Sequence, residues 1–366
     1  GKWQNVNVPA IHIGGWYDCF AQGTIDGFMG YQYQGGPDAK GKSKLIMGPW
    51  THGSGRVQGE LLYPENAVDN FSFKMLVDMI EQYTMDNGEN FDDWPSVLYY
   101  VMGDVDNESA PGNIWLISSD WPVSYDEVPV YLTADNRLTD TFPDSSNEFS
   151  YEYNPTDPVP TIGGQNLNIA RGPYDQRVVE TRDDVIVFTT DSLSDSVWIA
   201  GPIKTRLYVS SNCFDTDFTV KLTDVYPDGR SMLITDGILR MRNRNGVDHW
   251  DFMEPGEIHE IEIDLWSKDH QIRISVSSSN APRFLPNPNT KEAMRQNETY
   301  LVAENTILVG NEHPSQIILP LVNLNYEQEV RRSYEELTDL KKDFYFRHPV
   351  LHVVQDSFTL NSLLVQ

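Results

Sequence analysis

An aspartate and a histidine near the start of the chain each follow a short apolar run. Asp18 comes after Ile-His-Ile-Gly-Gly-Trp-Tyr, and His52 comes after Leu-Ile-Met-Gly-Pro-Trp-Thr. In an open parallel α/β sheet, reactive side chains lie beyond the carboxyl ends of the strands. There a histidine can take the proton of a serine hydroxyl while an aspartate orients the imidazole and stabilises its charged form. The pair therefore predicts the base and the acid of a serine-hydrolase triad.

Each residue also has a simpler interpretation. Asp18 alone is an ordinary helix cap after a strand, and His52 alone is a loop histidine. The matching glycine and aromatic neighbours favour the catalytic interpretation. Side chains more than about 6 Å apart would instead favour a non-catalytic binding module, whereas hydrogen-bond reach would favour the triad.

The chain has no recognisable nucleophile. The elbow Gly-x-Ser-x-Gly does not occur in it, and Ser54, in His-Gly-Ser-Gly, lacks both the outer glycine spacing and a preceding strand. In α/β-hydrolases the order along the chain is nucleophile, acid, base, and the order of Asp18 and His52 agrees with it. We therefore expect Gly1 to be a cut within a longer protein, with the serine and the oxyanion hole upstream, and we expect this chain alone to be inactive.

The elements that must position this pair follow from periodicity. Strand and helix patterns alternate as in a parallel α/β sheet with crossover helices. The expected elements are buried strands at 8–14 and 44–47, helices at 23–33 and 70–88 with Gly88 as the cap, and a strand at 97–102 that leads away.

From about residue 114 the pattern changes to short alternating runs between turns, which is typical of a β-sandwich of the jelly-roll type. Asp228-Gly229 is a hairpin turn signal, 140–157 is expected to be a loop, and 326–344 is expected to be helical. The expected strands are 128–132, 185–189, 203–210, 218–224, 232–240, 256–265, 272–277 and 316–319.

Composition limits the partners. The net charge of −27 argues against nucleic acid and anionic membranes, because phosphate would be repelled. No run of about 18 apolar residues predicts a membrane span. Cys19 and Cys213 predict no disulfide framework, and the acidic turns near Asp215 and Asp104 are better explained as turn and sheet residues than as calcium ligands. We expect no metal and no cofactor.

Several motifs in order resemble the cocaine esterase / X-prolyl dipeptidyl-peptidase family (CocE/NonD hydrolases). The motifs are Gly14-Gly-Trp-Tyr-Asp-x-Phe20, Gly48-Pro-Trp-Thr-His52, Asp157-Pro-Val-Pro, Gly172-Pro-Tyr-Asp-Gln-Arg177, the run from Asp215 to Arg230, Asp236-Gly-Ile-Leu-Arg-Met-Arg242, Ser277-Ser-Ser-Asn280 and Pro314-Ser-Gln-Ile-Ile-Leu-Pro320. They cover about residues 8–322. The resemblance implies an α/β-hydrolase domain, an inserted helical cap and a C-terminal jelly roll.

The resemblance also implies roles for individual residues. Asp18 matches the family's catalytic aspartate, His52 its catalytic histidine, and Phe20 an aromatic that lines the acyl pocket. Trp16 and Tyr17 are candidate substrate contacts that also suit packing, and packing is favoured for Trp50. Family members that act on α-amino esters carry acidic residues just after the aspartate, whereas Cys19, Phe20 and Ala21 follow here, which favours a neutral ester or amide.

The sequence thus predicts the C-terminal part of an α/β-hydrolase sheet over 1–112, a jelly-roll β-sandwich over 113–322 and an unmatched, partly helical tail over 323–366. The connection at 265–271 is shorter than in the family. The tail is either an added interaction helix or a read-through or assembly artefact, and the second is favoured. The partner expected is a small-molecule ester or amide. Two other functions stay open, an X-Pro dipeptidyl-peptidase and a non-catalytic binding module. A homodimer is possible on the sequence, and the sequence does not predict the compartment.

Overall fold

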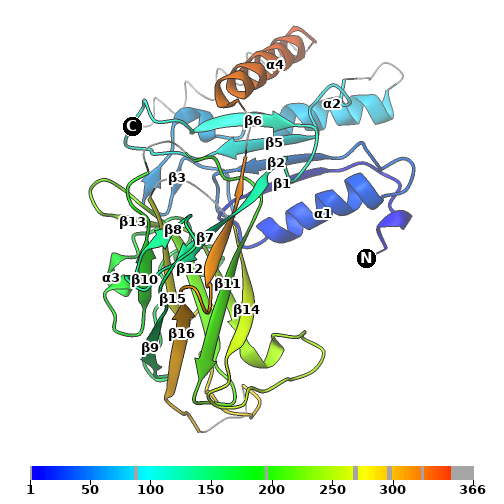
Figure 1. Cartoon of the computed structure of the whole chain (residues 1–366). Helices are drawn as coiled ribbons and strands as arrows, with labels where there is room; N and C mark the ends of the chain where they lie inside the picture. Colours follow the sequence, from blue (N-terminus) through cyan, green and yellow to red (C-terminus); the bar gives the residue numbers. More distant parts are fainter. Residues whose placement is uncertain are drawn as a thin grey trace.

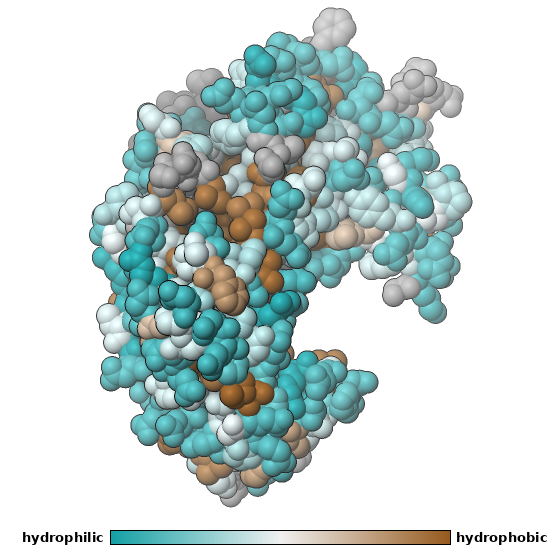
Figure 2. Space-filling view, in the orientation of Figure 1, coloured by the Kyte–Doolittle hydropathy of each residue, from teal (hydrophilic) through white to brown (hydrophobic). Residues whose placement is uncertain are grey.

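The computed structural model describes residues 2–85, 90–193, 197–266, 271–294, 299–322 and 325–347. A small sheet flanked by helices lies beside two further sheets that pack against each other (Figure 1). The visible surface is mostly hydrophilic, and it is hollowed on the side below helix α1 (Ala21–Gln34) (Figure 2). Among the described residues, buried apolar side chains form one main cluster in the sandwich and one on each face of the small sheet.

The small sheet has the order β1-β2-β5-β6. Its strands are β1 (Ile11–Gly15), β2 (Lys44–Gly48), β5 (Val97–Val101) and β6 (Ile114–Ser118). β1 pairs with β2 in parallel, β2 with β5 in parallel, and β6 closes the series as an antiparallel strand. The alternating strand–helix pattern in the sequence thus produces a sheet whose carboxyl ends meet at one edge.

Helices cover both faces of this sheet. α1 lies on one face, and α2 (Ser72–Thr84) and α4 (Tyr326–Arg347) lie on the other (Figure 1). Alternate side chains of β2 reach opposite layers, because Leu45 and Met47 pack with Phe28 of α1 while Ile46 packs with Met75 of α2. None of the described helices is long and apolar enough to cross a membrane.

Two expectations for this sheet are wrong. β1 is not buried on both faces, because it lies at the edge of the described sheet and Ile13 is 48% exposed. β5 does not lead away but continues the parallel series beside β2. The predicted cap Gly88 lies outside the described residues, and α2 ends at Thr84.

The two other sheets form a sandwich. One has the order β10-β15-β12-β13, and the second has the order β8-β7-β17-β11-β16-β9 with β14 paired to β11. The strands are β7 (Asp126–Leu132), β8 (Leu138–Thr139), β9 (Asn147–Tyr153), β10 (Ile186–Thr189), β11 (Pro202–Ser211), β12 (Asp217–Val225), β13 (Ser231–Arg240), β14 (His259–Trp266), β15 (Gln271–Ser277), β16 (Ala303–Val309) and β17 (Gln316–Leu321). Short elements complete the chain: η1 (Trp3–Asn5), β3 (Val57–Gln58), β4 (Leu61–Leu62), η2 (Glu65–Ala67), α3 (Arg177–Glu180) and η3 (Met241–Asn243).

The sandwich core lies between the inner faces of the two sheets. β11 alternates half-buried and buried residues along its whole length, so Leu207 and Val209 meet Val220 and Leu222 of the opposite sheet. The Asp228-Gly229 turn joins β12 and β13 as predicted, with Gly229 at φ +86°. Asp215 and Asp217 form ion pairs with Arg242 and Arg240, respectively.

The sequence analysis missed three strands of the sandwich, the short β8 and the longer β9 and β16. The predicted loop over 140–157 is wrong, because β9 occupies its centre and pairs with β16, which was also not predicted. Only Tyr151 and Tyr153 of β9 are buried, and its remaining residues are polar or half-buried. β9 is the last strand of its sheet, so many of its residues face solvent. The apolar pattern from which a strand is predicted is therefore weak there.

The tail contains the predicted helix, and that helix is packed. In α4, Leu337 and Phe344 are buried, and Ser333 Oγ accepts the N–H of Ile117 on β6 at 3.2 Å. Arg347 reaches Asp78 of α2 at 2.7 Å. The described part of the tail therefore packs against β6 and α2.

Candidate active site

Hydrogen bonds continue from β1 and β2 beyond the ends of both strands. The N–H of Trp16 donates to the carbonyl of Gly48, and the N–H of Tyr17 donates to the carbonyl of Trp50, both at 2.9 Å. Gly15 permits this approach, since a Cβ there would lie 2.1 Å from the carbonyl oxygen of Trp50. The two chain segments therefore leave the sheet side by side, which brings residue 18 close to residue 52.

The structure brings the predicted acid and base together. Nδ1 of His52 lies 3.1 Å from Oδ2 of Asp18, although the residues are 34 positions apart. Oδ1 of Asp18 accepts the N–H of Phe20 at 3.0 Å, so the carboxylate is held at both oxygens. The side chain of Asp18 is 11% exposed and that of His52 is 52% exposed. A carboxylate at Nδ1 favours the tautomer with its proton on Nδ1, which leaves Nε2 able to accept another proton.

Phe20 lies against the ring of His52. Its ring centroid is 5.3 Å from that of His52, in an edge-to-face arrangement. Its side chain is 53% exposed, so an apolar surface remains open beside the imidazole.

Trp16 and Tyr17 do not fit the predicted role of substrate contacts. Tyr17 is 3% exposed, and burial, reinforced by Tyr63 and Asp224, raises the pKa of its phenol well above the usual value. Trp16 packs on Trp121 and donates its Nε1–H to the carbonyl of Tyr100 at 2.9 Å. Both rings belong to the packing beneath the site.

Trp50 also belongs to the packing beneath the site, as the sequence favoured. It is buried, and its Nε1–H donates to the carbonyl of Ala67 at 2.7 Å.

One residue near the base was missed by the sequence analysis. Gln58 is buried, its Oε1 accepts the N–H of Thr51 at 2.9 Å, and its Nε2 donates to the carbonyl of Gly55 at 2.7 Å. Its side chain thus bridges the loop that carries His52. A polar glutamine between Val57 and Gly59 carries no pattern from which this role could have been predicted.

Cys19 does not suit the missing nucleophile. Burial and the neighbouring Asp18 carboxylate raise the pKa of its thiol, whereas a nucleophilic cysteine needs a lowered pKa.

Across the described residues, no group of three His, Cys, Asp or Glu side chains is arranged to hold a metal ion.

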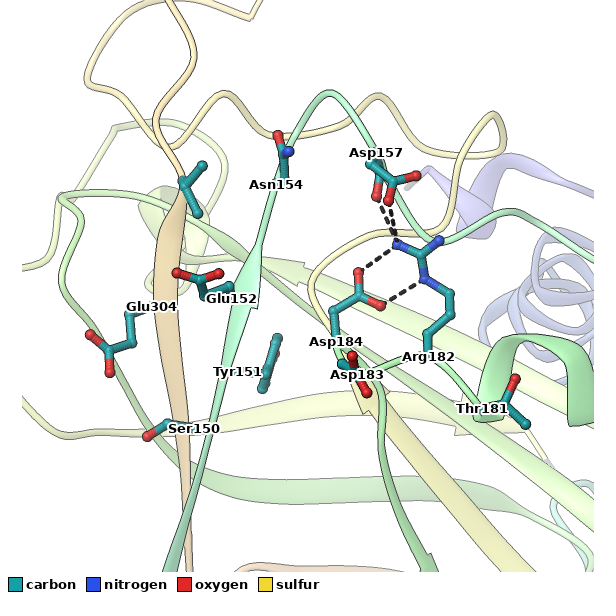
Figure 3. A pocket seen from close by; sticks show the side chains of 11 residues that line it. Ser150, Tyr151, Glu152, Asn154, Asp157, Thr181, Arg182, Asp183, Asp184 and Glu304 are labelled. Atoms are coloured by element: carbon teal, nitrogen blue, oxygen red, sulfur yellow. Dashed lines mark hydrogen bonds and ion pairs between the residues drawn. The ribbon is translucent and has the colours of Figure 1, made fainter.

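A separate groove of about 720 Å³ lies on the sandwich (Figure 3). Arg182 binds Asp184 through two hydrogen bonds of 2.7 and 2.9 Å and also contacts Asp157, while Glu152 and Glu304 face each other across β9 and β16. Neither Asp18 nor His52 lines this groove, so it is not part of the candidate site.

Solved structures of known proteins have a similar fold. The fold is similar to that of an α-amino acid ester hydrolase, with a TM-score of 0.76 and 25% identity over 87% of this chain and 56% of that one. An aminopeptidase from a marine sediment archaeon (Thaumarchaeota archaeon) has a similar fold, with a TM-score of 0.73 and 24% identity over 86% of this chain and 55% of that one.

Family models and a close relative define the family. Residues 89–318 match the X-Pro dipeptidyl-peptidase C-terminal non-catalytic domain, and residues 1–54 match the X-Pro dipeptidyl-peptidase S15 family. Cocaine esterase from Rhodococcus sp. (strain MB1 Bresler) is 34% identical over 88% of this chain and 59% of its own length. The chain belongs to the CocE/NonD family of X-Pro dipeptidyl-peptidase-like hydrolases. It spans somewhat more than half the length of the relatives that it matches.

Proposed function

We propose that this chain supplies the acid and the base of a serine hydrolase that cleaves an ester or an amide through an acyl-enzyme. The observation that carries the proposal is the 3.1 Å contact between His52 Nδ1 and Asp18 Oδ2. This distance is within hydrogen-bond reach, which favours a triad over a non-catalytic binding module.

In the proposed reaction, Nε2 of His52 takes the proton of a serine hydroxyl as its oxygen attacks the substrate carbonyl. The imidazolium then gives this proton to the departing alcohol or amine, which leaves the acyl group on the serine. Water attacks the acyl-enzyme with His52 again as the base, releasing the acid. Asp18 holds the imidazole in the required tautomer and stabilises its positive charge throughout.

The nucleophile and the oxyanion hole are proposed to lie in a segment outside this chain. We propose that 1–112 form the C-terminal part of the α/β-hydrolase domain, that 113–322 form a jelly-roll sandwich except for β6, and that 323–366 form a tail. β6 pairs with β5, so it belongs to the small sheet and the predicted boundary after residue 112 is too early. The two face-to-face antiparallel sheets support the sandwich assignment. On this proposal the chain by itself does not turn over substrate.

The proposed substrate is a small neutral ester or amide. Phe20, exposed beside His52, offers an apolar contact, and residues 19–21 provide no carboxylate to bind a substrate ammonium group. An X-Pro dipeptidyl-peptidase is the alternative within the same chemistry, and the family models matched at 1–54 and 89–318 support it. The two differ in whether a free N-terminal amine on the substrate raises kcat/KM.

The experiment is turnover of a chromogenic short-chain ester by the complete protein. His52→Ala should abolish turnover, whereas retained activity would overturn the assignment. His249→Ala is a matched control, because His249 Nδ1 also lies 3.1 Å from a carboxylate oxygen, that of Asp248, but on an exposed loop. This control should keep the activity of the parent protein.

A further inference from the structure

The sandwich contacts the turn that carries the acid. The hydroxyl of Tyr17 donates to the carbonyl of Leu233 on β13 at 3.2 Å, in a buried position. Next to it, Nε2 of Gln165 donates to the carbonyl of Trp16 at 2.9 Å. The two residues that precede Asp18 are therefore each tied to the sandwich rather than to the sheet alone.

A second set of contacts reaches the loop that carries the base. The N–H of Glu60 donates to the carbonyl of Pro173 at 2.9 Å, and the N–H of Asp175 donates to Oε2 of Glu60 at 3.0 Å. Gly59 adopts φ +56°, and a Cβ there would lie 2.2 Å from the carbonyl oxygen of Pro173. The sandwich backbone thus presses directly against the β3–β4 turn.

Gln58 connects this turn to the base. It precedes Gly59 in the chain, and its buried amide bridges Thr51 and Gly55, which flank His52 on both sides. Because both Oε1 and Nε2 of Gln58 are hydrogen-bonded to the loop that carries His52, a displacement of β3 displaces that loop as well. A buried N–H or carbonyl left without its partner is costly, which resists any change in this arrangement.

We infer that the sandwich sets the position of His52 relative to Asp18, and that Gln58 is the positioning residue through which it acts on His52. The inference rests on the proposed function for its catalytic consequence, but not for the geometry itself. It assigns a role in catalysis to the part of the chain that matches a non-catalytic domain.

The first test uses this chain with ¹⁵N-labelled histidine and follows the imidazole tautomers by NMR. The His52 signals are assigned by their loss in His52→Gln. Gln58→Leu should convert the His52 ring from a single Nδ1–H tautomer to a mixture, because the loop no longer holds the ring on Asp18. Gln82→Leu is the matched control, since Gln82 Oε1 likewise accepts the N–H groups of Phe91 and Asp92 away from the site, and it should leave the His52 signals unchanged.

The second test measures kinetics in the complete protein. Gln58→Leu should lower kcat by roughly 10- to 100-fold, the loss expected for a misplaced catalytic group, with a smaller change in KM. Should this variant not fold, Glu60→Ala tests the same connection. It should lower kcat as well, while Glu60→Gln, which keeps the acceptor for the N–H of Asp175, should restore it.

The outcomes separate this inference from the proposed function. A single Nδ1–H tautomer and unchanged kcat in folded Gln58→Leu would overturn the inference while leaving the triad in place. Full turnover by His52→Ala would overturn the catalytic assignment, and the NMR result would still decide whether Gln58 positions the ring.

Discussion

The carboxylate of Asp18 serves two partners at once, His52 Nδ1 through one oxygen and the N–H of Phe20 through the other. The first bond is that of a triad acid, and the second anchors the carboxylate to the turn that leads into α1. Asp18 is not the helix cap that the sequence allowed, because the N-cap of α1 is Phe20 and no side chain caps it; Asp18 instead braces the turn before the helix. The local turn fixes the direction in which the acid points.

Asp18→Asn in the complete protein should keep the fold and lower kcat by about 10³- to 10⁴-fold, because an amide no longer selects the imidazole tautomer that can accept the serine proton. Steady-state ester hydrolysis measures this effect. Asp26→Asn is the control, since the Asp26 carboxylate accepts only an exposed hydrogen bond from Gln22 in the described structure. Equal activity of the two variants would contradict the acid assignment.

Phe20→Ala should lower kcat/KM for an apolar ester by about 3- to 10-fold, in line with the loss of one aromatic contact beside the base. Its stability should change little, because the ring is exposed. Phe142→Ala is matched to it, since Phe142 is similarly exposed and lies edge-to-face on Tyr131 at the same 5.3 Å centroid separation. A normal kcat/KM in Phe20→Ala would exclude the ring from the substrate site.

His12 should make stability depend on pH. Burial lowers the pKa of His12 from 6.5 to about 4, since its ring packs against Phe28 and Tyr31 and its Nε2 is buried without a hydrogen bond among the described residues. The folded-state pKa is below the unfolded one, so the unfolded chain binds more protons as the pH falls. The contribution of neutral, buried His12 to the free energy of unfolding is therefore complete above pH 6.5. It is lost as the pH falls from 6.5 towards 4.

The measurement compares urea unfolding of the parent chain and His12→Phe at several pH values. The parent should lose about 1–2 kcal/mol relative to the variant between neutral pH and pH 4. His249→Phe, at an exposed position, should track the parent. Parallel pH profiles for the parent and His12→Phe would show that the pKa of His12 is the same in the folded and the unfolded chain.

The tail helix should contribute to stability. Leu337→Ala removes a buried side chain of α4 and should cost about 2–5 kcal/mol in urea unfolding. Tyr334→Ala, three residues earlier on the same helix, is 71% exposed and should change stability by less than about 0.5 kcal/mol. An equally small effect for both would show that α4 does not pack on the sheet in solution.

Much of the fold follows from local pattern. The strand at 44–47, the helices after Phe20 and near Ser72, the Asp228-Gly229 hairpin and most sandwich strands carry the periodicity of their final state. β9 does not, because it is the last strand of its sheet and most of its residues are polar and face solvent. β16 lies inside the sheet, but Glu304, Asn305 and Thr306 interrupt its apolar pattern. The burial of β1 was also misjudged, since an apolar run shows that a strand forms but not how many neighbours it has.

The sequence by itself determined the chemistry that is available, because residue type and spacing name Asp18 and His52 as an acid and a base at successive strand ends. Only the tertiary structure decided that they touch, since their 3.1 Å contact depends on parallel pairing and on the close approach at Gly15. It also decided that Tyr17 faces inward and that Gln58 holds the loop of the base. Tyr17 contacts Leu233, which is 216 positions away, whereas Gln58 contacts Thr51 and Gly55 nearby through a side-chain amide, and neither contact leaves a periodic pattern in the sequence.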